Sequence, residues 1–329
     1  MEPIKICSLN CQGLGDPKKR KDVFNYLRNK KFNIYLLQDT HFEGKMEPYI
    51  RAEWGLECIF NSNNSQSRGV AIFFNNNFEY KINAIDRDDK GNFLTVDVCI
   101  NNNTITLVNV YGPNQDCPDF YRNIKEKYED RKCIMGGDWN LVIDPDRDYH
   151  NYKHVNNPTA RQQLLEILDT MQLVDVSRTF HPEEIRYTWR RKNPIKQARL
   201  DFFLVSDQLF EKVKNCSIEA GYRTDHSMIT LNLGLNTHKR RQTFWKFNNS
   251  LLKDTEYTKI IKDLIVQIKQ QYAVPIYNQA NIKDIPNSII QWCINDQLFL
   301  ETLLMEIRGK TISYATFKKK EREKKKMNL

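Results

Sequence analysis

The sequence predicts a mixed α/β domain in which two sheets pack face to face with helices outside, followed by an α-helical extension. Short β-like runs with turn residues between them recur from Ile4 to about Leu233, and a few helical stretches interrupt them. Beyond Leu233 these runs stop, and apolar residues recur at helical spacing. A chain of 329 residues has room for one large domain and an appendage, because single cores seldom grow past about 250 to 300 residues.

Nine runs in the first part have the composition of strands. They cover residues 4–9, 34–37, 56–60, 70–74, 93–100, 104–111, 133–135, 200–205 and 229–233. The three asparagines at 101–103 predict an antiparallel hairpin between the fifth and sixth runs. Helices are expected at 19–29, 120–128 and 160–171, because apolar residues there fall on one face.

The pattern divides the chain into a main domain over 1–235, a linker over 236–250 and a helical part with a basic tail over 251–329. A first amphipathic helix is expected between Tyr257 and Ile268. A second is expected to begin near Pro286, with Ile289, Ile290 and Cys293 in its first turns. These helices either dock on the main domain or bridge to a larger polypeptide, and the lysine-rich end favours the bridge.

The positive charge is concentrated at one end of the chain. Of the formal net charge of +9, residues 317–326 contribute +5, from seven Lys or Arg and two Glu, which leaves +4 for the other 319 residues. A nearly balanced body argues against a protein that grips nucleic acid over its whole surface and favours local basic patches. The tail itself fits three roles equally: binding of RNA, a nuclear address, or a solvated helix end.

Cysteine usage and hydropathy indicate an intracellular protein. The eight cysteines form no paired C-x-x-C pattern, and most lie in apolar runs, as reduced core thiols do. Cys7, Cys11 and His41 fit no common zinc spacing. The start of the chain does not resemble a signal peptide, and no segment approaches the roughly 18 apolar residues of a membrane helix. We expect a soluble protein of nucleus and cytoplasm with no membrane partner.

Five polar clusters lie at or just past the ends of β-like runs, where open α/β folds gather their sites. They cover residues 8–10, 36–40, 136–140, 199–201 and 224–226. Asp39 follows a strand and suits Mg²⁺, which prefers oxygen ligands, although alone it could be a turn or cap residue. Asp138 and Asn140, two positions apart after two glycines, would point the same way from an extended loop, although alone they could form a turn.

Asp201 and His226 are expected to form a pair. Asp201 is embedded in a run so apolar that burying its charge would be costly without a partner. A hydrogen bond from Asp201 would orient the imidazole of His226 and stabilise its charged form, which could neutralise a phosphate oxygen in the transition state. The inventory of carboxylates, amides and one imidazole suits the cutting of a phosphodiester.

The ordered set of Asn10, residues 38–40, 111–114, 137–140, 199–201 and 224–226 resembles the endonuclease/exonuclease/phosphatase superfamily over about residues 4–233. Within it, the chain looks most like the endonuclease domain of LINE-type (non-LTR) retrotransposons. Gln12 stands where apurinic-site repair enzymes typically have an acid. Residues 244–252, Phe-Trp-Lys-Phe-Asn-Asn-Ser-Leu-Leu, and the lysine-rich end are similar to the connector that leads to the reverse transcriptase.

This resemblance implies a four-layered α/β sandwich and a Mg²⁺-dependent nick in double-stranded DNA, with Mn²⁺ able to substitute. The nick leaves a 3′-hydroxyl that primes reverse transcription of the element's RNA, and the reverse transcriptase is expected in the same polypeptide. By position, Asp39 holds the metal with Asn10 beside it, and Asp225 completes the metal site. Asp138 orients or deprotonates the attacking water. The remaining roles fall to Asn140, which positions the water, Tyr111, which donates its phenol to the phosphate, and His226 oriented by Asp201.

One departure from the resembling family concerns the metal ligand, which is usually Glu and here is Asp39. The missing methylene draws the carboxylate back by roughly 1.5 Å, judged from C–C bond lengths. A bridging water, a closer strand end, or substitution by Glu43 would each compensate, and Asp39 is the preferred ligand.

A second site is expected at residues 189–199, which hold five bases, no acid, and an Asn-Pro turn between β-like flanks. In the resembling endonucleases a hairpin at this place helps to choose the target; the alternative is a solvated hairpin tip. The expected DNA-contacting residues are Asn114, Thr188, Arg190, Arg191, Lys192, Lys196 and Thr224. Rival interpretations of the whole chain are an apurinic-site repair endonuclease or phosphatase of the same fold, and a binding module whose catalysis has decayed.

Overall fold

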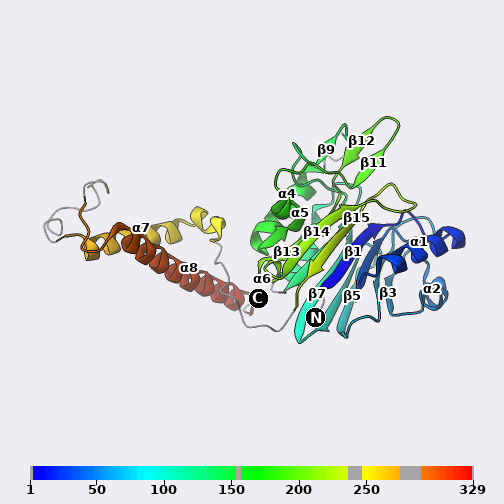
Figure 1. Cartoon of the computed structure of the whole chain (residues 1–329), viewed down its shortest axis with the longest axis horizontal. Coiled ribbons are helices and arrows are strands. Elements are labelled where there is room, and N and C mark those ends of the chain that lie inside the picture. Colours follow the sequence, from blue (N-terminus) through cyan, green and yellow to red (C-terminus); the bar gives the residue numbers. More distant parts are fainter. Residues whose placement is uncertain (1–2, 130, 153–156, 236–246, 275–289, 328–329) are drawn as a thin grey trace. The chain divides into compact units, whose positions relative to one another are not determined.

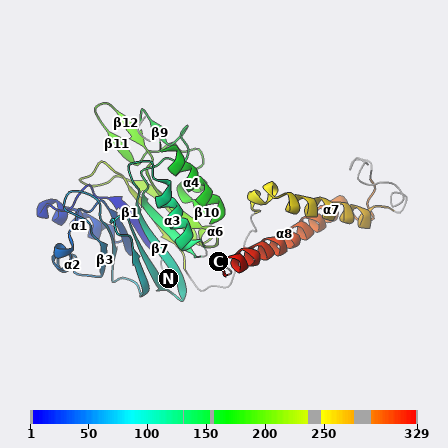
Figure 2. The same cartoon turned by 180° about the vertical axis from the view of Figure 1, so that it is seen from behind.

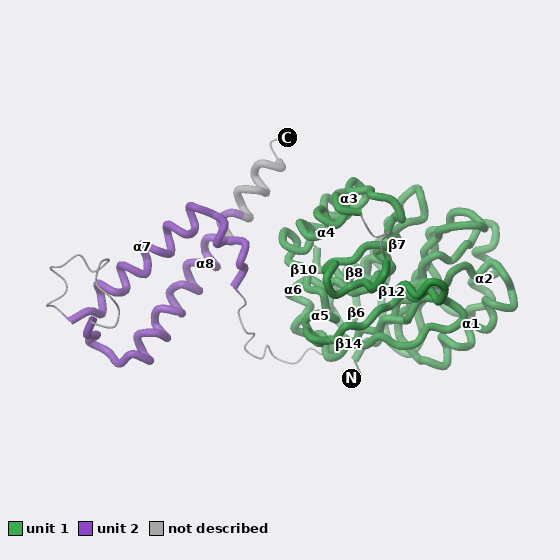
Figure 3. Tube along the Cα trace, turned by 90° about the horizontal axis from the view of Figure 1, so that it is seen from above, with its two compact units in different colours: residues 1–241 green, residues 242–329 purple. Residues whose placement is uncertain are grey.

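The structure is a computed structural model that describes residues 3–129, 131–152, 157–235, 247–274 and 290–327. It divides into two compact units, residues 1–241 and 242–329, which are drawn in different colours in Figure 3. Most of the expected linker and the first three residues of the motif at 244–252 lie outside the described residues, as does Pro286.

Two mixed six-stranded sheets form the first unit (Figure 1). The strands of the first sheet, in order across it, are β14 (Val213–Glu219), β15 (Met228–Leu233), β1 (Ile4–Asn10), β2 (Ile34–Gln38), β4 (Val70–Phe74) and β3 (Cys58–Asn61). In the second they are β10 (Leu173–Asp175), β13 (Asp201–Ser206), β8 (Cys133–Asp138), β7 (Asn103–Tyr111), β6 (Phe93–Ile100) and β5 (Lys81–Arg87). Each sheet has one parallel pair at its centre, β1 with β2 and β7 with β8, and its other neighbours are antiparallel.

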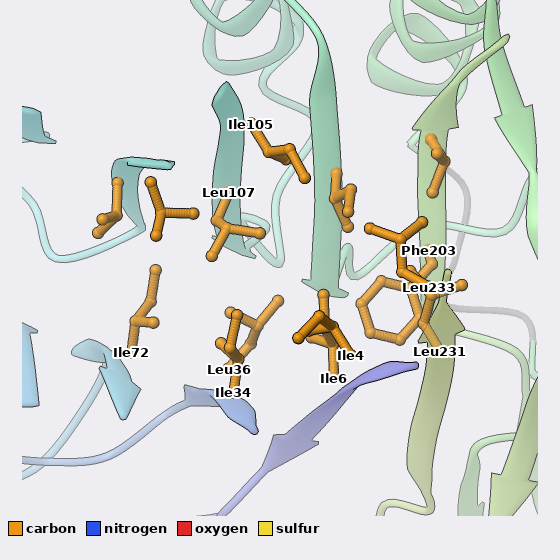
Figure 4. Close-up of a cluster of buried hydrophobic side chains, with 14 of the residues drawn as sticks. Ile4, Ile6, Ile34, Leu36, Ile72, Ile105, Leu107, Phe203, Leu231 and Leu233 are labelled. Carbon is orange, nitrogen blue, oxygen red and sulfur yellow. The ribbon is translucent and has the colours of Figure 1, made fainter. Parts of the chain in front are cut away.

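The main core lies between the sheets. Ile6 and Ile72 of the first sheet meet Leu107 and Phe203 of the second there (Figure 4). The outer face of the first sheet packs against α1 (Pro17–Lys30) and α2 (Glu47–Trp54), and that of the second against α3 (Pro118–Tyr128) and α4 (Pro158–Thr170). Figures 1 and 2 show the helices on opposite sides of the sheet pair. The expected four-layered sandwich is confirmed.

All nine expected strands are present, with ends that differ by up to three residues. The expected hairpin joins β6 to β7, and Asn101 and Asn102 form its turn with φ of 49° and 60°, the left-handed region that asparagine tolerates. Helix α1 begins earlier than expected because Asp16 caps it and Pro17 fits its first turn. The helical elements of this unit that the pattern did not indicate are α2, η1 (Gly44–Met46), α5 (Val176–Phe180) and α6 (Asp207–Phe210).

A small third sheet stands apart from the two large ones at the top of Figure 1. Its strands are β11 (Trp189–Arg191), β12 (Lys196–Ala198) and β9 (Tyr149–His150). Strands β11 and β12 form the basic hairpin expected at 189–199.

The second unit is a helical pair, with η2 (Asn249–Lys253), α7 (Thr255–Tyr272) and α8 (Asp296–Met327). The Tyr257 hydroxyl lies 2.7 Å from the Thr311 hydroxyl. The expectation of a helix that already includes Ile290 and Cys293 is wrong: the helix begins at Asp296 because Asn295 caps it, with its side chain accepting from Leu298 N at 2.8 Å. The lysine-rich segment continues this helix.

Candidate active site

Polar residues end the two parallel strand pairs at the same edge of the sandwich. β1 ends at Asn10, and its neighbour β2 ends at Gln38, directly before Asp39. β7 ends at Tyr111, which is in register with Asp138 at the end of β8. Parallel neighbours bring their carboxyl ends to one edge. The two sheets meet there, because Asn10 Nδ2 donates to Asp138 Oδ2 at 2.8 Å.

Asp201 and His226 join this cluster from the two sheets. Strand β13, which carries Asp201, neighbours β8, and β15, which follows His226, neighbours β1. Asp201 begins β13 and is in register with Asp138, and His226 lies just before β15. His226 Nδ1 is 2.9 Å from Asp201 Oδ2, and His226 Nε2 is 3.8 Å from Asp138 Oδ2. All three side chains are buried. The imidazole therefore lies between two carboxylates that come from residues 63 positions apart, 138 and 201.

The burial of this cluster shifts its proton affinities. Burial raises the pKa of Asp138 to about 7, and the negative charge of Asp201 acts in the same direction. For His226, burial favours the neutral ring, but the charges of Asp201 and Asp138 outweigh this and raise its pKa to about 9. At neutral pH the imidazole is charged, and Asp138 is able to exchange a proton.

Backbone geometry fixes the Asp138 carboxylate. Asn140 N donates to Asp138 Oδ1 at 3.0 Å, and the Asn140 amide donates to Gly112 O at 2.7 Å. Asn140 has a φ of 49°. A Cβ at Gly137, where φ is 153°, would lie 1.9 Å from Val110 O, so only glycine fits directly before Asp138.

Asp39 lies in a second polar group beside this cluster. Asp39 Oδ1 accepts a hydrogen bond from Arg68 N at 3.0 Å and lies 3.0 Å from His41 Nε2. The Tyr111 phenol lies close enough to Asp39 for the charge of that carboxylate to act on it. Burial and the charge of Asp39 raise the pKa of Tyr111, so the phenol stays protonated and can donate.

The residues at this edge fit a divalent cation held by oxygen. Mg²⁺ usually takes one or two protein carboxylates and completes its shell with water and substrate. Asp138, Asp201 and His226 lie close enough to form a ligand group, with atoms within 4.8 Å of one another. A charged imidazole has no free lone pair for a metal, however, so the Asp39 carboxylate with Asn10 beside it is the better match. In the buried pair of Asp201 and His226, Asp201 Oδ1 has no hydrogen-bond partner among the described residues.

Three other expected site residues differ in their exposure to solvent. Thr188 is fully buried, and its hydroxyl accepts from the N–H groups of Leu200 and Asp201 at 3.0 Å each. Thr188 therefore holds the start of β13 in place, which corrects the expected contact with DNA. Thr224 is half-buried and donates to Asn10 O at 2.9 Å. Asn114 is exposed.

Asp225, expected as a metal ligand, is exposed and makes a different contact. Its Oδ2 accepts from Trp189 Nε1 at 2.9 Å, which ties the loop before His226 to the basic hairpin. Asp225 does not belong to the acidic group around His226 that the described residues form.

The basic hairpin borders a groove of about 720 Å³ that reaches His226. Arg190, Arg191 and Lys192 line this groove and are exposed, while Lys196 is half-buried on β12. The fifth base of the segment, Arg199, is not available to DNA. It is buried, with a two-pronged ion pair to Asp148 at 2.8 and 2.9 Å and a further contact to Asp175 at 2.7 Å.

The pattern also missed an amide pair that joins the sheets beneath the site. Gln38 Nε2 donates to Asn109 Oδ1 at 2.6 Å and to Ser8 Oγ at 2.9 Å. Asn109 Nδ2 donates in turn to the carbonyls of Leu37 and Ala71. Both amides are fully buried. Their signal in the sequence was an amide inside an otherwise apolar run.

Residues 7–226 match the model of the Endonuclease/Exonuclease/phosphatase family. The chain belongs to this family. Its members are nucleases and phosphatases that depend on a divalent metal, so the chain is a metal-dependent hydrolase of phosphate esters. The superfamily resemblance expected from the ordered motifs is thereby confirmed.

Solved structures share the family's fold. An AP endonuclease from Leishmania major is 18% identical with a TM-score of 0.63, over 71% of this chain and 89% of that one. An AP endonuclease from Archaeoglobus fulgidus is 21% identical with a TM-score of 0.57, over 70% and 99%. A 3′ phosphatase from Neisseria is 20% identical with a TM-score of 0.55, over 70% and 99%.

A longer relative comes from a transposon. The chain is 27% identical over 268 residues, 79% of its length, to the uncharacterized 149 kDa protein of transposon TX1 from Xenopus laevis. The chain spans 20% of that protein.

Among the described residues, none of the helices combines the length and the apolar character needed to cross a membrane.

Proposed function

We propose that this chain is a Mg²⁺-dependent endonuclease that nicks double-stranded DNA and leaves a 3′-hydroxyl, which primes reverse transcription of a LINE-type (non-LTR) retrotransposon. The observation that carries the proposal is the buried imidazole of His226 between Asp201 and Asp138, next to the oxygen-rich group of Asp39 and Asn10. Membership of a nuclease family and likeness to a transposon protein support the choice of substrate.

In this mechanism Asp138 takes the proton of the attacking water, and Asn140 positions that water. The water oxygen bonds to phosphorus while the bond to the 3′-oxygen breaks. The departing 3′-oxygen takes up a proton from solvent water and becomes the 3′-hydroxyl, and the phosphate stays on the 5′-oxygen of the other fragment. Charged His226, oriented by Asp201, and the Tyr111 phenol donate hydrogen bonds to the phosphate oxygens, where negative charge develops. A divalent cation held by Asp39 and Asn10 would neutralise charge on the phosphate and the leaving oxygen.

Asp225 has a supporting role in this proposal. Its contact with Trp189 positions the hairpin and the loop that carries His226. The exposed bases Arg190, Arg191 and Lys192, together with Lys196, Asn114 and half-buried Thr224, would contact the DNA backbone. Phosphate contacts of this kind position a protein on DNA without reading its sequence.

At the level of the whole polypeptide, we assign residues 1–235 to the endonuclease domain and 251–329 to a connector. The transposon relative, of 149 kDa against 39.1 kDa, is about four times as long as this chain, which supports a reverse transcriptase in the same polypeptide. The basic end of α8 would then bind the element's RNA, act as a nuclear address, or remain a solvated helix end. Action on chromosomal DNA requires entry into the nucleus.

The rival functions differ in their products. A phosphatase would release inorganic phosphate, and the Neisseria neighbour is a 3′ phosphatase. A repair endonuclease would need an apurinic site, and a decayed binding module would cut nothing. The complete set of groups around His226 argues against decay, because a buried Asp, His and Asp cluster without a function would only destabilise the fold.

The test is to incubate the whole chain with supercoiled plasmid free of apurinic sites, with Mg²⁺ or with a chelator. We expect conversion to the nicked circle with Mg²⁺ only, and extension of the nick by a DNA polymerase without prior removal of a 3′-phosphate. Release of inorganic phosphate from a 3′-phosphorylated oligonucleotide without nicking would favour the phosphatase. Nicking only of depurinated plasmid would favour the repair enzyme.

A further inference from the structure

Arg68 stands at the border of the site in a strained backbone conformation. It belongs to the loop between β3 and β4, where it is the only charged residue from position 61 to 69. Its φ is 64°, in the left-handed region that favours glycine, and its side chain is exposed. A conformation of this kind costs free energy and persists only where the surrounding structure holds it in place. Such residues cluster at functional sites.

The backbone of Arg68 is bound to the Asp39 turn on both sides. Arg68 N donates to Asp39 Oδ1 at 3.0 Å, and Arg68 O accepts from His41 N at 2.9 Å. The next carbonyl, of Gly69, accepts from Thr40 N at 3.0 Å. These bonds fix the point from which the arginine side chain leaves the backbone, beside the carboxylate that fits the cation.

The guanidinium is available for a ligand. In the described part of the chain, no carboxylate lies within ion-pair distance of it. Burial and Asp39 raise the pKa of the Tyr111 phenol, and the positive charge of Arg68 acts on the same phenol in the opposite direction. Arg68 is therefore close enough to influence the phenol that we propose as a donor to the phosphate.

We propose that Arg68 binds a backbone phosphate of the substrate DNA beside the phosphate that is cut, on the Asp39 side of the site. The proposal rests on the proposed function. An arginine offers paired N–H donors that match phosphate oxygens, and the loop around it supplies no competing charge. The exposed bases of the β11–β12 hairpin border the His226 side, so phosphates would be held on both sides of the reacting one.

The left-handed backbone allows a test that separates binding from folding. Arg68→Gly removes the charge and relieves the backbone strain, whereas Arg68→Lys keeps the charge. Lys81 serves as a matched control for loss of one exposed charge. Lys81 is exposed on β5. The register of β5, β6 and β7 places it level with Thr104, at the other end of the second sheet from Tyr111.

The experiment measures binding of a fluorescent 30-base-pair duplex by the whole chain at several salt concentrations with Mg²⁺, in an Asp138→Asn background that slows cutting. We expect Arg68→Gly to weaken binding about threefold to tenfold and to flatten the slope of log affinity against log salt by about 0.9, the value for one phosphate contact. Its melting temperature should be unchanged or raised. Arg68→Lys should keep the slope, and Lys81→Ala should match the parent.

Two results would overturn the assignment in distinguishable ways. If the Asp138→Asn parent binds no duplex, the proposed function fails and the role of Arg68 fails with it. If the parent binds but Arg68→Gly shows the parent's slope and affinity, or weakens binding only together with a fall in melting temperature, Arg68 is structural and the proposed function stands.

Discussion

Asp39 bears most directly on which metal chemistry the site can perform. One of its oxygens, Oδ1, already faces two hydrogen-bonding nitrogens, Arg68 N and His41 Nε2, each at 3.0 Å. Oδ2 is therefore the oxygen that Asp39 would offer to a divalent cation, and Mg²⁺ usually takes water for its remaining ligands. This arrangement suits a shorter carboxylate where the resembling family usually has Glu.

We predict that Asp39→Ala abolishes both Mg²⁺-dependent nicking and the binding of one Mn²⁺, measured by titration calorimetry. The matched control is Glu43→Ala, because the Glu43 carboxylate instead pairs with Lys45 at 2.6 Å. Glu43→Ala should retain both properties. The opposite pattern, with metal binding lost in Glu43→Ala and kept in Asp39→Ala, would transfer the ligand role to Glu43.

The protonation of Asp138 and His226 sets the pH dependence. The pKa of Asp138 is raised to about 7, so the carboxylate needed as a base forms as pH rises through that value. The pKa of His226 is raised to about 9, so the charged imidazole is lost as pH rises further. Single-turnover nicking should follow a bell with its maximum between these values, with a bound cation moving the acid limb lower.

His226→Gln provides the control for this profile. Its residual rate should lack the alkaline limb, because the group that titrates there has been removed. A parent rate that climbs steadily through pH 10 would contradict a role for charged His226.

Residue identities in the cluster followed from the sequence, but their surroundings did not. Asp201 required a partner because of its apolar neighbours, and His226 lies within hydrogen-bonding distance of it. The burial of Thr188 and of Arg199 could not be predicted, because both depend on groups far along the chain. Arg199 meets Asp148 and Asp175, and no local pattern links these three positions.

Among the elements, the β11–β12 hairpin carries three exposed bases that line the groove reaching His226. We predict that the double variant Arg191→Gln, Lys192→Gln flattens the salt slope of DNA binding by about 1.8, or 0.9 for each lost phosphate contact. The control pair Lys81→Gln, Lys132→Gln removes the same charge at the opposite end of the second sheet and should leave the slope unchanged. Equal slopes in both pairs would make the hairpin a solvated tip.

Strand prediction worked best where both faces of a strand are buried. β4 and β6 have the expected bounds, because continuous runs such as Val-Ala-Ile-Phe-Phe leave little choice. β5 and β14 were missed because they are edge strands with exposed positions and interspersed charges, which weaken the apolar pattern and protect the edge from pairing. The start of α8 was misplaced because an asparagine cap, Asn295, outweighed the spacing of apolar residues.

At the scale of the whole molecule, the two sheets have the same plan. Each places a parallel strand pair at its centre, and each pair ends in polar residues. These are Asn10 and Gln38 in one sheet, with Asp39 directly after Gln38, and Tyr111 and Asp138 in the other. Packing the sheets face to face brings these ends together, and the buried Gln38 and Asn109 amides bridge the sheets just beneath them. The layered fold was accessible from strand patterns, whereas the buried amide pair that bridges the sheets was not.

The most direct measurement is the single-turnover rate at which the whole chain nicks supercoiled plasmid, compared between the parent and Asp138→Asn. The substitution keeps the shape of the side chain but removes the base, and melting temperatures show whether both proteins are folded. We predict a rate lowered about 10²- to 10⁴-fold, the usual contribution of a positioned base, in a variant that still binds DNA. A folded Asp138→Asn protein that nicks within twofold of the parent rate would contradict the proposed mechanism.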